Sequence, residues 1–169
     1  TDPKLADYYT ALDKENCTDG YQWRAGDALN AAIGQGDTTV TPLQMVSAYA
    51  TIGNGGIRHT PRLIEKIGTK RVRGVKATRV VSRHTANRMM AMFRDVVVEG
   101  TGTEAAIPGY TVAGKTGTAQ KAENGRYVRK YVASFVEPVH AKKARFANLV
   151  MVDEPQGNIY GAVVGAPAF

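Results

Sequence analysis

The stretch "GYTVAGKTGTAQ", residues 109–120, decides between two folds for this chain. Gly109, four further residues and then Gly114, Lys115 and Thr116 satisfy G-x-x-x-x-G-K-[ST], the pattern of a phosphate-binding loop. The same letters contain Lys-Thr-Gly, a motif that belongs to a different chemistry. The two interpretations require different secondary structure in the neighbouring residues, so the sequence on either side of the motif discriminates between them.

A phosphate-binding loop must lead directly into a helix, whose N-terminus and amides face the phosphates. A helix after Thr116 would have Gly117 in its first turn and would meet Asn124 and Gly125 before three turns were complete. Pro108 stands directly before the pattern, where a buried strand is required. The apolar run "LVMVDE", residues 149–154, matches a strand with a magnesium-binding Asp, but it cannot replace the missing helix. A nucleotide hydrolase therefore remains only as a distant third hypothesis.

The alternative places the motif on the first strand of a hairpin, where side chains alternate between the two faces. Lys115 and Gly117 then share one face, while Thr116 and Thr118 take the other. An ammonium and two hydroxyls suit a carboxylate, and a glycine lets a ligand approach the backbone. The pattern predicts a strand that holds the anionic end of a peptide.

Two amphipathic segments elsewhere in the chain predict helices. Thr41 followed by Pro42 is a helix start, and the glycines of "GNGG", residues 53–56, end this helix. Apolar residues cover most of its surface, so we expect it to be buried. A second helix is expected from Thr85 to the glycine at position 100, with its apolar residues at helical spacing.

The remaining segments predict irregular structure and antiparallel strands. Residues 1–25 are polar and turn-rich, which indicates an irregular lead-in, and residues 62–82 indicate a peripheral hairpin around a basic turn. Residues 110–169 indicate consecutive sheet strands, among them 127–136 after an Asn-Gly turn and another from Arg145. The fold class expected is α+β, an antiparallel sheet packed against helices.

Composition limits the classes of partner. The 169 residues carry a net charge of +7, and their basic residues are scattered apart from residues 66–79, which lack interleaved aromatics. We favour a solvated basic hairpin over nucleic-acid binding. The single Cys17 and three separated histidines show no metal-ligand spacing, so neither a metal nor a cofactor is expected. The sequence contains neither a run of 18 apolar residues nor a signal peptide at its start.

Three separated blocks, taken together, carry a specific resemblance. They are "AIGQGDTTVTPLQMVSAYATIGNGG", "EGTGTEAAIPGYTVAGKTGTAQ" and "RFANLVMVDEP". In order and spacing they resemble the transpeptidase domain of class B penicillin-binding proteins, over about residues 23–169. The resemblance implies the penicillin-binding and serine β-lactamase-like transpeptidase fold, with residues 1–169 forming the C-terminal portion of a single domain.

The resemblance also implies roles for the motif residues. Lys115 would supply positive field and hydrogen bonds to active-site hydroxyls, and Thr116 and Thr118 would bind the terminal carboxylate beside Gly117. The backbone N–H of Thr118 would be one half of an oxyanion hole. The implied substrate is a peptidoglycan stem peptide that ends in D-Ala-D-Ala, and β-lactams would mimic that end.

The chain departs from the family in three places. The family's nucleophile lies in Ser-x-x-Lys, followed by Ser-x-Asn, and neither motif occurs in the 169 residues. We therefore expect the chain to begin after those motifs and, alone, to be inactive. The segment "VEPVHAKKAR", residues 136–145, stands where the family commonly has a Gly-containing turn, which leaves the pairing of its two strands open. A family helix that follows "GAPAF" and packs on the sheet is expected to be missing.

These expectations extend to partners and location. The missing N-terminal part of the domain and other cell-wall synthesis proteins are expected partners, at the extracytoplasmic face of the bacterial membrane, with the anchor outside this chain. The alternative hypothesis is a noncatalytic interaction module of the cell-wall synthesis machinery.

Overall fold

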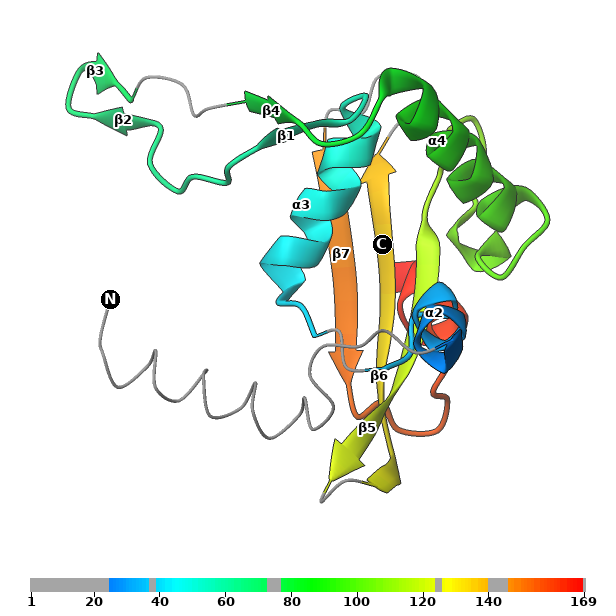
Figure 1. Ribbon diagram of the computed structural model, residues 1–169. Helices are drawn as coiled ribbons and strands as arrows, with labels where there is room; N and C mark the ends of the chain where they lie inside the picture. The colour runs from blue at the N-terminus through cyan, green and yellow to red at the C-terminus, as the bar shows by residue number, and fades with distance from the viewer. Residues whose placement is uncertain (1–24, 37–38, 73–76, 124–125, 140–145, 169) are drawn as a thin grey trace. The chain divides into compact units, whose positions relative to one another are not determined.

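The computed structural model describes residues 25–36, 39–72, 77–123, 126–139 and 146–168 (Figure 1). The chain divides into two compact units, Thr1–Thr38 and Thr39–Phe169. The described part of the first unit holds helix α2, Ala25–Ala32, which the sequence analysis did not predict. The irregular lead-in expected for residues 1–25 lies outside the described residues, apart from Ala25, which begins α2.

The second unit is organised around an antiparallel sheet in the order β5-β6-β7. The strands are β5, Lys115–Glu123, β6, Arg126–Val139, and β7, Phe146–Asp153. β6 extends beyond the predicted residues 127–136, and its ladder with β7 continues to the pair Val139↔Phe146. This answers the question left open for the two strands around residues 136–145. A register shift between Gln120 and Ala122 interrupts the pairing of β5 with β6.

Helices cover both faces of this sheet, which confirms the α+β arrangement. Helix α3, Pro42–Gly53, packs on one face at β6 and β7, as Figure 1 shows. The opposite face meets α5, Gly161–Val164, at β5 and β6, and the 3₁₀ turn η2, Ala166–Ala168, packs against α5 and η1. These two short helices correct the expectation of sheet strands throughout residues 110–169. Gly161 lies against the backbones of Gly117 and Ser134, and a continuing strand would not place it there.

A small apolar cluster fills the space behind the sheet on the α5 side. It consists of Val97, Ala105, Val112, Phe135 and Ala166. Phe135 is 1% exposed, and burying an aromatic side chain of this size stabilises a fold by about 1.5–3 kcal/mol. The cluster therefore fixes the middle of β6 against the turns that precede β5.

Helix α3 starts where the sequence predicted. Thr41 caps it and accepts a hydrogen bond from the Gln44 N–H (3.2 Å), while the Gln44 side chain accepts one from the Thr41 N–H (2.8 Å). The expectation that α3 is buried is wrong, because Thr51 is the only residue of the helix that is fully buried. One side of α3 packs on the sheet, and two apolar hollows flank its other sides.

Helix α4, Arg83–Val98, begins two residues before the predicted Thr85. The reason is the cap, since the Ser82 hydroxyl accepts a hydrogen bond from the Thr85 N–H (3.0 Å). Its buried residues, Ala86, Phe93 and Val97, belong to the predicted stripe. The chain then turns through residues 99–102 into the 3₁₀ turn η1, Thr103–Ala105.

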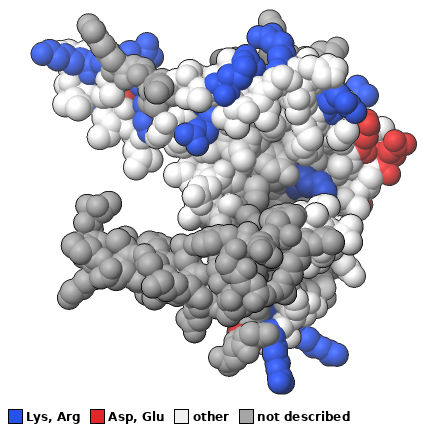
Figure 2. Space-filling model, in the orientation of Figure 1, with Lys and Arg blue, Asp and Glu red and all other residues white. Residues whose placement is uncertain are grey.

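The predicted peripheral hairpin forms differently from the expectation for residues 62–82. Strand β1, Ile57–His59, pairs with β4, Ala77–Arg79, and a second ladder joins β2, Lys66–Ile67, to β3, Lys70–Arg71. Gly68, with a φ of +59°, allows the two-residue turn inside the second ladder. We call residues 57–72 and 77–79 the arm. Lys and Arg side chains gather over it in Figure 2.

One acidic side chain is buried in the sheet without a partner. Glu137 on β6 is 1% exposed, and neither carboxylate oxygen has a hydrogen-bond partner. Burial raises the pKa of Glu137 from 4.5 to about 7. Within the described residues, the structure contains no helix of the length and apolarity that a membrane span requires.

Candidate functional site

The Lys-Thr-Gly residues occupy the beginning of β5, the edge strand of the three-stranded sheet described. Residues 115–123 form a strand, whereas a phosphate-binding loop requires a helix at this point, so the third hypothesis is ruled out. The register of Lys115 to Gln120 with Val136 to Tyr131 is continuous. Side chains therefore alternate along this stretch, with Thr116 and Thr118 on one face.

Two hydrogen bonds show which way the backbone N–H and C=O groups of β5 point, toward β6 or toward the outer edge. The Gly114 N–H donates to the Phe93 carbonyl of α4 (3.0 Å), so the groups of Gly114 point away from β6. The Tyr131 carbonyl of β6 accepts from the Glu154 N–H (2.9 Å) beyond β7, so Tyr131 points toward β7. Directions alternate along each strand, and the two observations agree that Gly117 points toward Ser134, its partner on β6.

The same alternation turns the backbone of Thr116 and Thr118 outward. Their N–H and C=O groups point to the edge of β5 that carries no other strand in the described sheet. The Lys115 ammonium confirms the direction for Thr116, because it donates to the Thr116 carbonyl at 2.9 Å. An extended ligand at this edge would meet two outward N–H groups on either side of Gly117.

The lysine of the motif is exposed and is held by its own strand. Its Nζ lies 2.9 Å from the Thr116 carbonyl oxygen and 3.4 Å from the Thr116 hydroxyl. In the described part of the chain, no carboxylate forms an ion pair with Lys115. The positive charge is therefore available to an anion that binds at the edge.

Both threonine hydroxyls are held by groups that are distant in sequence. The Thr116 hydroxyl lies 2.9 Å from the Thr101 hydroxyl, in the turn after α4. The Thr118 hydroxyl accepts a hydrogen bond from the Gly161 N–H at 3.1 Å, at the start of α5. The sequence analysis identified neither Thr101 nor Gly161, since both contacts depend on tertiary packing.

Glycines allow the close approaches around this strand. A Cβ at Gly117 would clash with the Ser134 hydroxyl, and one at Gly161 would clash with the carbonyls of Gly117 and Ser134. A Cβ at Gly114 would lie 2.6 Å from the Phe135 ring. The strand is thus packed backbone to backbone against α5, with little freedom to shift.

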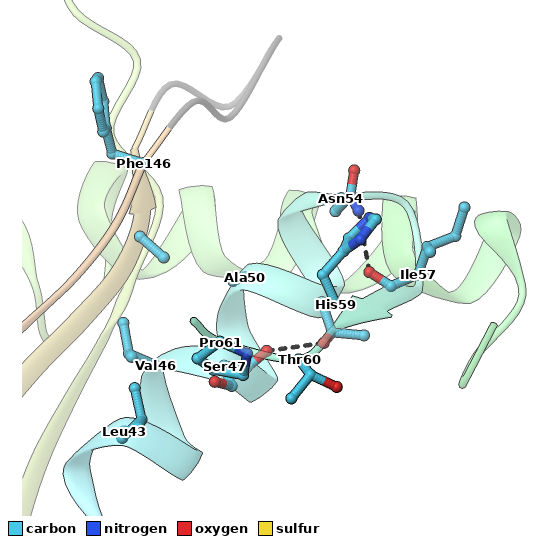
Figure 3. A pocket seen from close by; sticks show the side chains of 12 residues that line it. Leu43, Val46, Ser47, Ala50, Asn54, Ile57, His59, Thr60, Pro61 and Phe146 are labelled. Carbon is cyan, nitrogen blue, oxygen red and sulfur yellow. Dashed lines mark hydrogen bonds between the residues drawn. The ribbon is translucent and has the colours of Figure 1, made fainter. Parts of the chain in front are cut away.

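The two apolar hollows beside α3 do not belong to this site. One, of about 390 Å³, lies between α3, β1 and the start of β7, and Figure 3 shows Val46, His59 and Phe146 among its lining residues. The other, of about 680 Å³, lies between α3 and α4. Neither is lined by residues of β5. In the described ranges, no group of three or more His, Cys, Asp or Glu side chains could hold a metal ion.

The model of the penicillin-binding protein transpeptidase domain matches residues 6–169. The chain belongs to this transpeptidase family. The resemblance found in the three sequence blocks is therefore confirmed.

Similar proteins agree with this assignment. Stage V sporulation protein D of Bacillus subtilis is 37% identical over 150 residues, which are 83% of this chain and 23% of the relative. Peptidoglycan D,D-transpeptidase FtsI of Escherichia coli K12 is 38% identical over 151 residues, 88% of this chain and 25% of the relative. This chain thus spans about a quarter of the length of these relatives.

Solved structures show the same fold. Penicillin-binding protein 3 of Mycobacterium tuberculosis, in its apo form, is 35% identical with a TM-score of 0.75, over 88% of this chain and 37% of that one. The apo transpeptidase domain of penicillin-binding protein 3 from Burkholderia pseudomallei is 33% identical with a TM-score of 0.75, over 88% and 44%. The transpeptidase-family chain adopts part of the penicillin-binding transpeptidase fold.

Proposed function

We propose that this chain is the carboxylate-binding portion of a peptidoglycan D,D-transpeptidase. The observation that carries the proposal is the outer edge of β5, which no other strand covers among the described residues. The Lys115 ammonium, the Thr116 and Thr118 hydroxyls and the outward Thr118 N–H belong to four consecutive residues of this strand. Family membership and the relative named peptidoglycan D,D-transpeptidase support the reaction class.

In the proposed complex, the end of a stem peptide lies extended along this edge. Its terminal carboxylate accepts hydrogen bonds from the hydroxyls of Thr116 and Thr118, and Lys115 adds positive field. Gly117 lies between these two threonines, and its missing side chain leaves room for the Ser134 hydroxyl. The carbonyl of the penultimate D-alanine then reaches the Thr118 N–H.

The chemistry is acyl transfer in two steps. A serine hydroxyl attacks the carbonyl carbon of the penultimate D-alanine, and its proton passes to the leaving nitrogen. The C–N bond to the last D-alanine breaks, and that residue leaves as a free amine. The negative oxygen of the tetrahedral intermediate is stabilised by the Thr118 N–H. An amine of a second stem peptide then attacks the acyl-enzyme, forms the cross-linking amide and returns the proton to serine.

The serine is proposed to come from residues outside these 169, because no Ser-x-x-Lys occurs among them. The proposal includes the remaining part of the domain as a partner, together with other cell-wall synthesis proteins. It also places the parent protein at the extracytoplasmic face of the membrane, with an anchor outside this chain. β-Lactams are proposed ligands because they mimic the D-Ala-D-Ala end.

Acylation by a fluorescent penicillin tests the proposal. The full-length protein is expected to gain one penicillin mass in intact-protein mass spectrometry, whereas the 169-residue chain alone gains none. Thr116→Val and Thr118→Val in the full-length protein should each slow acylation about tenfold or more, because hydrogen bonds to a charged group contribute about 1.5–3 kcal/mol.

The matched control is Thr78→Val, on the exposed strand β4 of the arm, which should leave the rate unchanged. Absence of any adduct on the full-length protein would refute the enzymatic function. An adduct on the 169-residue chain alone would refute the external nucleophile.

A further inference from the structure

The turn between α4 and η1 brings one hydroxyl to the Lys-Thr-Gly strand. The Thr101 hydroxyl lies 2.9 Å from that of Thr116, although fifteen residues separate them. The side chain of Thr101 is exposed, so burial does not require this hydrogen bond. We therefore looked for a function of the hydrogen bond between the Thr101 and Thr116 hydroxyls.

Two glycines place Thr101 there. Gly102 donates its N–H to the Val96 carbonyl (2.9 Å), which folds the turn back onto the end of α4. A Cβ at Gly100 would lie 2.7 Å from the Cα of Val96, and one at Gly102 would lie 3.1 Å from the Val96 side chain. A side chain at position 100 would clash with the backbone of Val96, and one at position 102 would be tightly packed, so the two glycines permit the return that holds Thr101 beside β5.

The hydrogen-bonding capacity of the Thr116 hydroxyl makes the contact informative. A hydroxyl has one proton to donate and two lone pairs that accept. The Lys115 ammonium, 3.4 Å from the Thr116 Oγ1, can only donate. When Thr101 also donates, both lone pairs of Thr116 are occupied by the protein, and its single proton is left for an anion at the edge.

The second threonine of the motif is arranged in the same way. The Gly161 N–H donates to the Thr118 hydroxyl, and a backbone N–H cannot reverse its role. The proton of Thr118 is therefore also directed to a group other than α5. The backbone contact leaves the Thr118 hydroxyl as a donor, and the side-chain contact does the same for Thr116 when Thr101 donates.

We propose that Thr101 is a positioning residue that holds the Thr116 hydroxyl as a hydrogen-bond donor to the substrate carboxylate. Thr101 acts through Thr116 and does not itself touch the ligand. This inference rests on the function proposed above and deepens it, because it assigns part of the selectivity for a terminal carboxylate to the turn after α4. Donation from Thr101 polarises the Thr116 O–H and strengthens its bond to the anion.

The test uses the full-length protein with Thr101→Val, which keeps the shape of the side chain and removes its hydroxyl, and Thr101→Ser, which keeps the hydroxyl. The acylation rate constant is measured with a penicillin and with the methyl ester of its carboxylate. Thr101→Val should slow the reaction of the acid about fivefold, in keeping with the net value of one hydrogen bond, and leave that of the ester within twofold. Thr101→Ser should react like the wild type with both compounds.

Two further variants separate positioning from a structural role. In a Thr116→Val background, adding Thr101→Val should cause no further loss, because the group on which it acts is gone. Thr103→Val, an exposed threonine in the next turn, should leave both rates unchanged. Melting temperatures identify any variant that is misfolded, and Thr101→Ala replaces Thr101→Val if the valine lowers stability.

Equal losses with the acid and the ester, additive losses in the double variant, or failure of Thr101→Ser to react normally would each overturn the inference. These results differ from a failure of the proposed function itself, in which the wild-type protein would not be acylated by either compound.

Discussion

The β5–β6–β7 sheet and the arm both consist of antiparallel strands, but their side chains meet different surroundings. The middle of β6 is enclosed, with Phe135 at 1% exposure, and helices lie on both faces of the sheet. In the arm, strands β2, β3 and β4 are exposed throughout, and Leu63 is 104% exposed. The sheet is stabilised by burial, whereas the arm depends on its turn and on polar contacts.

The comparison explains why the candidate site lies on the sheet. A site that binds a carboxylate needs its hydrogen-bond donors held in place. Strand β5 meets this requirement, because it is packed against α5 through the contact between Gly161 and the backbone of Gly117. The arm offers many cations without such support. Rigid placement, more than positive charge, distinguishes the two regions.

The largest expected effect is on the core of the sheet. Phe135→Ala should destabilise the protein by about 3–5 kcal/mol, because it leaves a cavity among Val97, Val112 and Ala166. Urea unfolding of the full-length protein measures the change. Leu63→Ala in the arm is the matched control and should change the free energy of unfolding by less than about 0.5 kcal/mol. Similar losses for the two variants would break the distinction between the regions.

The second prediction concerns the buried acid of the sheet. The pKa of Glu137 is about 7 in the folded protein and 4.5 ordinarily, so the folded state binds more protons between these values. Stability should therefore fall as pH rises from 4.5 to 7, by about 3 kcal/mol, and remain low above pH 7.

Glu137→Gln should remove this part of the pH dependence, which urea unfolding at a series of pH values would measure. Glu65, paired with Arg71 in the exposed arm, provides the control, and Glu65→Gln should leave the profile unchanged. An identical profile in Glu137→Gln and wild type would show that Glu137 is not responsible.

Gly161→Ala tests the contact between α5 and β5. The added Cβ would clash with the carbonyls of Gly117 and Ser134, so we expect about 1–3 kcal/mol of destabilisation and slower acylation by penicillin. Gly26→Ala on α2 is the control, since a Cβ there meets no atom within 4 Å. Normal acylation in Gly161→Ala would show that β5 tolerates displacement from α5.

The smallest effect is expected in the arm. Arg79 donates to the carbonyls of Gly55 (2.9 Å) and Val81 (3.1 Å), which fixes the base of the arm to the turn after α3. Arg79→Ala should increase proteolytic cleavage within the arm and leave the melting temperature within about 2 °C. Lys70→Ala, on β3, should alter neither. A large fall in melting temperature would show that the arm is integrated with the sheet.

The sequence predicted those features of the fold that depend on residues close together in the chain. Thr41 and Pro42 predicted the start of α3, and the impossibility of a helix after Lys115 predicted strand β5. Residues that meet across long separations were not predicted, because spacing within a segment carries no information about tertiary contacts. Thr101 reaches Thr116 across fifteen residues, and Gly161 reaches Thr118 across 43.

The predictions for the arm and for the segment that contains α5 were wrong for a related reason. Short strands such as β2 and β3 contain two residues each, too few for an alternating pattern, and the pairing of β1 with β4 spans the arm. Helix α5 has four residues, and its place against the sheet depends on Gly161. Short elements are determined by what they pack against.

The register shift between Gln120 and Ala122 gives the candidate site a finite length. Pairing of β5 is continuous only from Lys115 to Gln120, a stretch of about 20 Å in an extended strand. A β-bulge bends the strand that carries it, so a straight peptide main chain at the outer edge would pair with this stretch alone. We therefore expect the proposed ligand to contact β5 through only its last few residues.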